Sequence, residues 1–127
     1  MRRLDTVGGL AELDEGDLPL IAARACRIAV DESELEHPLA VDGLRTVELR
    51  HEDLTLAARV RDLSEQLDQA GWAAQESDDR EQCEVFFRRS RAALALAFAL
   101  SGQPDEAIYE AAHAVGTPDD LVQRLAT

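Results

Sequence analysis

Residues 92–120 read AALALAFALSGQPDEAIYEAAHAVGTPDD, and this stretch decides the fold. Residues 92–100 are apolar on every face of a helix, which is typical of a helix that neighbours cover on several sides. A glycine followed two residues later by a proline then occurs twice, as Gly102 with Pro104 and as Gly116 with Pro118. Glycine commonly ends a helix in the left-handed conformation, and proline fits the first position of the next helix. We therefore expect helices over 79–101, 104–115 and 118–126.

Two more helices are expected before this stretch. Asp17 is suited to cap a first amphipathic helix that runs to about Val30. A second helix is indicated over 52–71, with leucine and valine at helical spacing and Gly71 at its end. Trp72 follows that glycine, and we interpret it as a plug at the end of the core.

The segment between these two helices has a different character. Residues 39–50 contain β-branched side chains that partly alternate around Asp42-Gly43, which is a favoured pair for a tight hairpin turn. This pattern favours a small β-hairpin, with a plain extended connection as the alternative.

The fold expected from these patterns is mainly α. It is one domain of about five helices around the central apolar helix 79–101, with the small β-hairpin near 39–50. Residues 1–16 contain glycines and acidic residues, and we expect them to be a flexible lead to this helical domain.

Residues 88–118 carry a further pattern. Small and apolar residues recur through two successive helices, at Leu94, Ala95, Phe98, Gly102, Ala107, Ile108, Ala111, Ala114 and Pro118. The segment resembles one tetratricopeptide repeat, a family whose stacked helical hairpins form peptide-binding grooves. It departs from that family at Arg91 and Ala111, where aromatic residues are usual, and Pro118 arrives one residue early. No second copy precedes Arg88, so the resemblance covers about a quarter of the chain.

The charge of the chain restricts its partners. Acidic residues outnumber basic ones 26 to 13, the formal net charge is −13, and every basic residue is arginine. Such a field repels phosphate backbones and anionic lipid headgroups, so we expect neither nucleic-acid nor membrane binding. The longest apolar run, residues 92–100, is about half of what a membrane span needs.

The cysteines and the N-terminus favour a cytoplasmic location. Cys26 and Cys83 are far apart and lie on or beside apolar helix positions, so we expect buried free thiols in a reducing compartment. No apolar run follows Arg2 and Arg3, so we expect no secretory signal.

The three histidines share one spacing. His37, His51 and His113 each follow a glutamate by three residues, namely Glu34, Glu48 and Glu110. On a helix this spacing provides ligand pairs in ferritin-like di-iron carboxylate bundles. Only Glu110 and His113 are expected to share a helix face, and that face is expected to be solvated. A divalent metal or iron site at these two residues is therefore an alternative to the absence of any cofactor.

The remaining candidate residues suggest contacts with another protein. Arg88 and Arg91 belong to the only basic run, which provides either intramolecular ion pairs or a site for an acidic peptide or phosphate. Ala95 and Ala99 form a strip of small residues that allows another helix to approach, and Tyr109 is either a contact or an ordinary surface tyrosine. No nucleophile motif or phosphate loop is present.

We therefore expect a protein-protein interaction or self-association module without evident catalysis, with a homo-oligomer or another protein as partner. Besides the metal protein, the other alternative is an acidic neutraliser of a basic partner, of the immunity or antitoxin kind.

Overall fold

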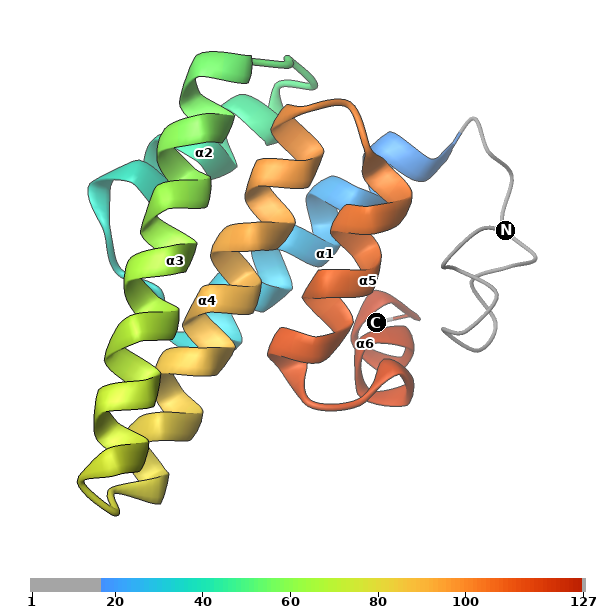
Figure 1. Ribbon diagram of the computed structural model, residues 1–127. Helices are drawn as coiled ribbons and strands as arrows, with labels where there is room; N and C mark the ends of the chain where they lie inside the picture. The colour runs from blue at the N-terminus through green and yellow to red at the C-terminus, as the bar shows by residue number, and fades with distance from the viewer. Residues whose placement is uncertain (1–16, 127) are drawn as a thin grey trace.

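Six helices make up the part of the protein that the computed structural model describes, residues 17–126. They are α1 Leu18–Ser33, α2 Pro38–Glu48, α3 Leu54–Glu76, α4 Arg80–Leu100, α5 Pro104–Val115 and α6 Pro118–Ala126 (Figure 1). The mainly α fold is confirmed, whereas the expected count of about five helices is too low. The expected lead at 1–16 lies outside the described residues.

Helix α4 is the centre of the molecule, as its apolar run predicts. It packs against α1, α2, α3 and α5, and Figure 1 shows it between the α3 ribbon and those of α1 and α5. Six of its apolar side chains are completely buried, at Ala92, Ala93, Ala95, Leu96, Ala97 and Leu100. Buried apolar residues from all six helices join them in one core cluster.

The expected β-hairpin over 39–50 is wrong, because this segment is helix α2. Pro38 occupies the first turn, and the extended residue His37 caps the helix by accepting a hydrogen bond from the Leu39 N–H at Nδ1 (3.1 Å). The side of α2 that contacts the core is made of Ala40, Gly43, Leu44 and Val47, which recur at helical spacing. The turn-like Asp42-Gly43 pair therefore lies inside a helix, with Gly43 buried in the core.

Helix α3 also differs from the expectation, since it continues past Gly71 to Glu76. Gly71 is buried in the helix under the ring of Phe87 on α4, so close that a Cβ at this position would lie 2.8 Å from Phe87 Cε1. Trp72 does not plug the core: its side chain is 55% exposed, and its ring meets the Phe87 ring edge to face with centroids 6.3 Å apart. The glycine thus provides space for an aromatic neighbour and does not end the helix.

Helices α3 and α4 form an antiparallel hairpin whose turn projects beyond the other helices at the bottom of Figure 1. Inside this hairpin two buried serines join the helices: the Ser90 hydroxyl donates to the Ser64 carbonyl (3.0 Å), and the two hydroxyls are 3.4 Å apart. At the turn, the Asp79 side chain caps α4 by accepting from the Gln82 N–H (3.1 Å). The preceding residue Asp78 adopts a left-handed conformation (φ 60°).

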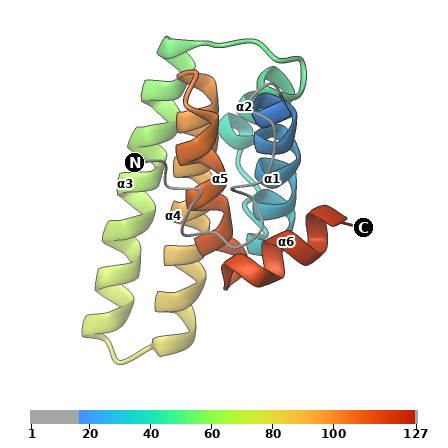
Figure 2. The same cartoon turned by 90° about the vertical axis from the view of Figure 1, so that its right-hand side faces the viewer.

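The C-terminal helices begin and end where the glycine-proline pairs predict. Gly102 is left-handed (φ 74°), and α5 and α6 both start at proline. Helix α6 contacts α5 and α1, and Figure 2 shows it lying across their ends. It buries Leu121 completely, and Arg124 pairs with Glu32 of α1. The resemblance of 88–118 to a tetratricopeptide repeat stays a prediction.

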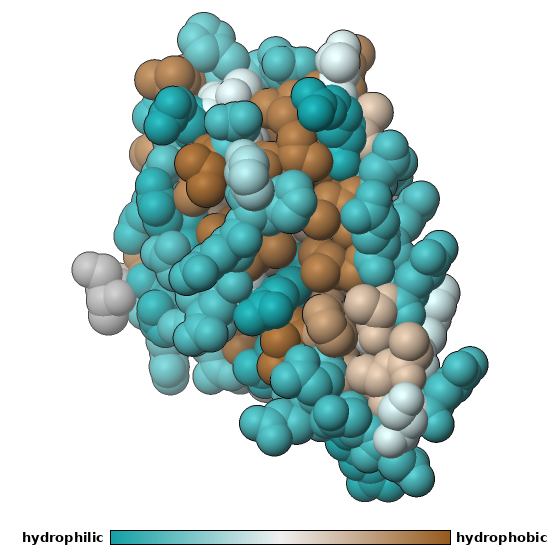
Figure 3. All heavy atoms as spheres, turned by 90° about the vertical axis from the view of Figure 1, so that its left-hand side faces the viewer, coloured by the Kyte–Doolittle hydropathy of each residue, from teal (hydrophilic) through white to brown (hydrophobic). Residues whose placement is uncertain are grey.

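None of the helices in the described part of the chain combines the length and the hydropathy that crossing a bilayer requires. Hydrophobic side chains are visible on the face that carries α2 and α3, where polar side chains divide them (Figure 3). The large apolar residues with exposed side chains are Leu20, Val41, Leu49, Leu54 and Trp72.

Candidate binding groove

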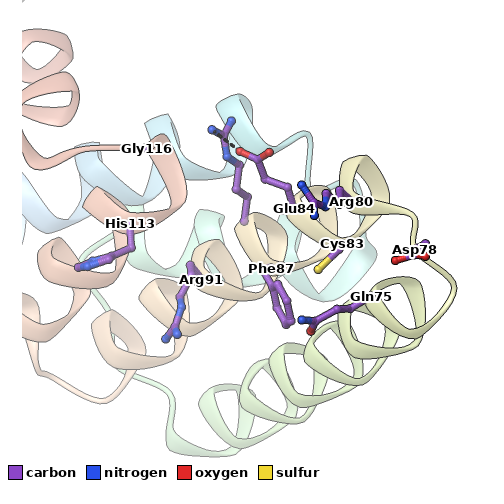
Figure 4. A pocket seen from close by; sticks show the side chains of 10 residues that line it. Gln75, Asp78, Arg80, Cys83, Glu84, Phe87, Arg91, His113 and Gly116 are labelled. Atoms are coloured by element: carbon purple, nitrogen blue, oxygen red, sulfur yellow. Dashed lines mark ion pairs between the residues drawn. The ribbon is translucent and has the colours of Figure 1, made fainter.

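A hollow lies between the projecting end of the α3–α4 hairpin and the turn that joins α5 to α6. It is an open groove of about 700 Å³. Helix α4 forms its floor, Gln75 and Asp78 border it at the tip of the hairpin, and His113 and Gly116 border it on the other side (Figure 4).

One face of α4 supplies most of the groove. Six residues of this helix line it: Arg80, Cys83, Glu84, Phe87, Arg88 and Arg91. They follow one another by three, one, three, one and three positions, which is the spacing of a single helix face. This face is largely charged and open to solvent.

Two of the groove arginines pair with glutamates. Arg88 Nη2 lies 3.0 Å from Glu84 Oε1 on the same helix, and both side chains are largely exposed (Figure 4). Arg91 Nη1 donates to Glu110 Oε2 on α5 over 3.1 Å. The Arg91 side chain is half exposed, whereas Glu110 is only 8% exposed. Arg91 therefore joins α4 to α5 and still presents part of its guanidinium to the groove.

The other two nearby arginines differ from this pair. Arg80, in the first turn of α4, forms no ion pair within residues 17–126. Arg89 turns away from the groove and donates from Nε to the Ser33 carbonyl at the end of α1 (3.1 Å). The basic run seen in the sequence is thus split between two sides of α4, and Arg80 shares the face of Arg88 and Arg91 near the start of the helix.

The candidate metal pair has other partners. Glu110 was expected on a solvated face, but it is buried and accepts a hydrogen bond from Arg91. His113 is exposed, its Nδ1 lies 2.9 Å from the Tyr109 carbonyl oxygen, and its ring rests against the Tyr109 ring. Residues 17–126 contain no group of three or more histidine, cysteine or acidic side chains placed to hold a metal ion. Glu110 and His113 therefore provide at most two ligands, one of which is in an ion pair.

The other two glutamate-histidine pairs are separated by helix ends. Glu34 is left-handed beyond the last turn of α1, and His37 caps α2. Glu48 belongs to α2, where it forms two hydrogen bonds with Arg27 of α1 (2.7 and 3.2 Å), while His51 follows in the connection to α3. The three glutamate-histidine pairs therefore share a sequence spacing but not a spatial arrangement.

The strip of small residues serves mainly internal packing. Ala95 is completely buried in the core cluster, so it offers no surface to a partner in this fold. Ala99 is half-buried and borders a smaller hollow of about 480 Å³ at the other end of α4. The surface expected to contain both alanines therefore does not exist as one patch.

The two cysteines occupy different environments. Cys26 is completely buried, and burial followed by the nearby Glu48 carboxylate raises the pKa of its thiol from 9.0 to about 12. Cys83 is half-buried in the groove, so the expectation of two buried thiols holds fully only for Cys26. Both are free cysteines.

Sequence reasoning identified Arg88 and Arg91 but missed Arg80, Phe87 and the pairing of Glu110. The spacing of Arg80, Glu84, Phe87 and Arg91 was a usable signal, because it places them on one helix face. The pairing of Arg91 with Glu110 had no local signal, because it depends on how α5 folds back on α4. No protein-family model, no curated protein sequence and no solved structure matches this chain.

Proposed function

We propose that this protein is a non-catalytic interaction module that binds a protein partner through the groove on α4. The observation that carries the proposal is the gathering of Arg80, Arg88 and Arg91 along one open groove of a chain whose net charge is −13.

The balance of charge in the groove supports a binding role. Its lining contains three arginines against the carboxylates of Asp78 and Glu84, in a chain with twice as many acidic as basic residues. Electrostatic complementarity of such a local patch selects partners and orients their approach.

The aromatic residues beside the arginines support the same role. Phe87 lines the groove, and its ring contacts the exposed Trp72. Arginine and aromatic side chains are enriched in protein interfaces, where they provide most of the binding energy. The groove thus offers both components on a single helix face.

The ionisable groups of the groove favour binding over catalysis. The Glu84 and Glu110 carboxylates are held by arginines. A catalytic base needs a free acceptor within reach of a substrate proton. The two glutamates instead hold Arg88 and Arg91 in place.

Photo-crosslinking in the source cells tests the proposal. A photoreactive amino acid replaces Arg88 in the groove, and in a matched variant it replaces Arg59, an exposed residue of α3 that does not line the groove. We expect a defined crosslinked protein from position 88 and none from position 59. A second copy of the chain would be recognised as a product of twice 13.9 kDa.

Crosslinking that is equal at both positions, or absent at position 88 in a folded variant, would contradict the proposed function. Circular dichroism melting of both variants establishes that each is folded.

A further inference from the structure

We infer that the groove takes an acidic segment of its partner protein, with carboxylates held by Arg80, Arg88 and Arg91 beside the Phe87 ring. This inference rests on the proposed function, and it names the chemistry of the partner.

Arg80 is a charged residue of the groove whose position in its helix is unfavourable. It is exposed, it forms no ion pair within residues 17–126, and it lies in the first turn of α4. The helix macrodipole disfavours a cation at that end of a helix. An arginine that lies against its helix dipole and lines a groove without an ion pair in the described part of the chain is suited to an anionic ligand.

Arg88 and Arg91 retain the capacity to bind more than their present partners. Each pairs through a single nitrogen, and each side chain is about half exposed, at 45% and 51%. A guanidinium has five N–H donors and can bind a carboxylate through two of them at once. Exposed ion pairs contribute only about 0–1 kcal/mol, so Arg88 can exchange Glu84 for an incoming carboxylate at little cost.

The spacing of the arginines fits a short peptide. Arg80 and Arg91 are eleven positions apart on α4, which corresponds to about 16 Å along the helix axis. An extended chain rises about 3.3 Å per residue, so about five residues span the three arginines. Phe87 lies between Arg80 and Arg91 on the same face and suits one apolar side chain near the middle of such a segment.

The acidic neighbours of the groove favour carboxylates over phosphates. Asp78 and Glu84 line it, and Glu110 lies against Arg91. A phosphate group carries about −1.5 to −2 charges at neutral pH and would be repelled by these carboxylates more strongly than a singly charged carboxylate. The groove also already holds two glutamates in the geometry that an acidic ligand would share.

Binding can be measured on the full chain with a synthetic peptide. The probe has five residues, a central leucine between two pairs of acidic residues, with blocked ends and a fluorescent label; its control carries the corresponding amides. Anisotropy measures the affinity at about 0.15 M salt, where a Debye length of about 8 Å screens the distant acidic residues of the protein. The emission of Trp72, the single tryptophan, reports whether the unlabelled peptide lies beside Phe87.

We expect saturable binding of the acidic peptide, a change in Trp72 emission, and at least about tenfold weaker binding of the amide peptide. Arg80→Gln should weaken the acidic peptide about tenfold, as expected for the loss of a charge-assisted hydrogen bond. Arg59→Gln makes the same change outside the groove and should leave the affinity within about twofold of the unmodified protein.

Equal affinity for the acidic and amide peptides, or equal losses in the Arg80 and Arg59 variants, would overturn the inference. Tenfold preference for a phosphoserine peptide would assign the groove to phosphate and contradict the choice of carboxylate. A dimer in sedimentation velocity that Arg88→Glu dissociates would make a second copy the occupant and would also overturn it.

The experiments distinguish a failure of the protein-binding function from a failure of the acidic-segment inference. Crosslinking at position 88 without any preference for the acidic peptide would leave the interaction module standing and remove the acidic partner. Peptide binding without crosslinking at position 88 would remove the protein-binding function, although the groove would still bind carboxylates.

Discussion

At the scale of single residues, left-handed backbone recurs at the helix ends. Each of the first four helices ends with a residue at φ between 55° and 74° and with the paired hydrogen bonds of a Schellman motif. Only α4 uses glycine for this position, at Gly102, whereas α1, α2 and α3 use Glu34, Arg50 and Asp78. A search for glycine could therefore locate the end of α4 but not the ends of the three helices before it.

Glu34 offers a direct test of this strain. Its φ is 55°, its N–H donates to the Asp31 carbonyl, and the following residue Leu35 is buried. Left-handed backbone costs a residue with a Cβ about 1–2 kcal/mol, a cost that glycine avoids. The greater freedom of glycine in the unfolded chain offsets part of this gain. We expect Glu34→Gly to raise the free energy of unfolding by about 0.5–1 kcal/mol in urea denaturation.

Glu36→Gly is the matched control, because Glu36 is exposed in the same connection and its φ is not positive. It should lower the free energy of unfolding by up to about 1 kcal/mol. A decrease of similar size in both variants would show that Glu34 is not left-handed.

At the scale of helices, α2 shows how tertiary burial overrides a local turn signal. The pair Asp42-Gly43 favours a hairpin only if neighbouring strands can use it. Here Ala40, Leu44 and Val47 are buried against the core on the same side as Gly43, and this helical spacing decides the structure. The same residues were available in the sequence, but the β-branched side chains and the turn pair outweighed them in the prediction.

Gly43→Ala distinguishes the two structures of this segment. A Cβ at position 43 would lie 3.6 Å from side-chain atoms of Val60 and Leu100, an ordinary contact. In a helix, alanine is favoured over glycine by about 1 kcal/mol, so we expect the free energy of unfolding to rise by about that amount. In a hairpin turn that requires positive φ, the same substitution would lower it.

Gly102→Ala is the comparison for this variant. Its φ is 74°, and a Cβ would lie 2.6 Å from Glu52 Oε1, so the substitution should destabilise by about 1 kcal/mol or more. Thermal melts of both variants, followed by circular dichroism, measure the opposite signs. A decrease for Gly43→Ala would contradict the helical assignment of α2.

At the scale of the whole molecule, the absence of lysine simplifies the pH dependence of stability at alkaline pH. The chain contains no lysine, and arginine side chains stay charged through the alkaline range. The alternative hypothesis of an acidic neutraliser depends on net charge alone, whereas the proposed interaction module has a candidate surface in the groove.

Cys26 should make the folded protein less stable at high pH. Its pKa is about 12 in the folded protein against 9.0 for the free thiol, so between these values the unfolded state releases a proton that the folded state keeps. The free energy of unfolding should therefore fall as pH rises above about 9, by about 1 kcal/mol per pH unit. Urea denaturation between pH 8 and pH 11 measures this slope.

Cys26→Ala should lose most of the alkaline slope, although the cavity it creates lowers stability at every pH. Cys83→Ala, at the half-buried thiol, should keep the slope. If the slope is the same in the unmodified protein and in Cys26→Ala, burial of the Cys26 thiol does not cause it.

The sequence by itself determined the helical class, the central position of 92–100 and the starts of α5 and α6. These features follow from local chemistry: an apolar run on all helix faces, glycine in the left-handed conformation and proline in a first turn. The basic run was also visible, although the sequence could not show that Arg89 faces away from Arg88 and Arg91.

Only the tertiary structure decided the features that depend on residues far apart in the chain. Helix α2 exists as a helix because α1, α3 and α4 cover its apolar side, and Gly71 lies inside α3 because the Phe87 ring fills the space above it. Glu110 is buried because α5 folds back and places it against Arg91. The groove depends on the same packing. The local sequence decides which residues share a helix face, but only burial against distant residues decides which face stays exposed to solvent.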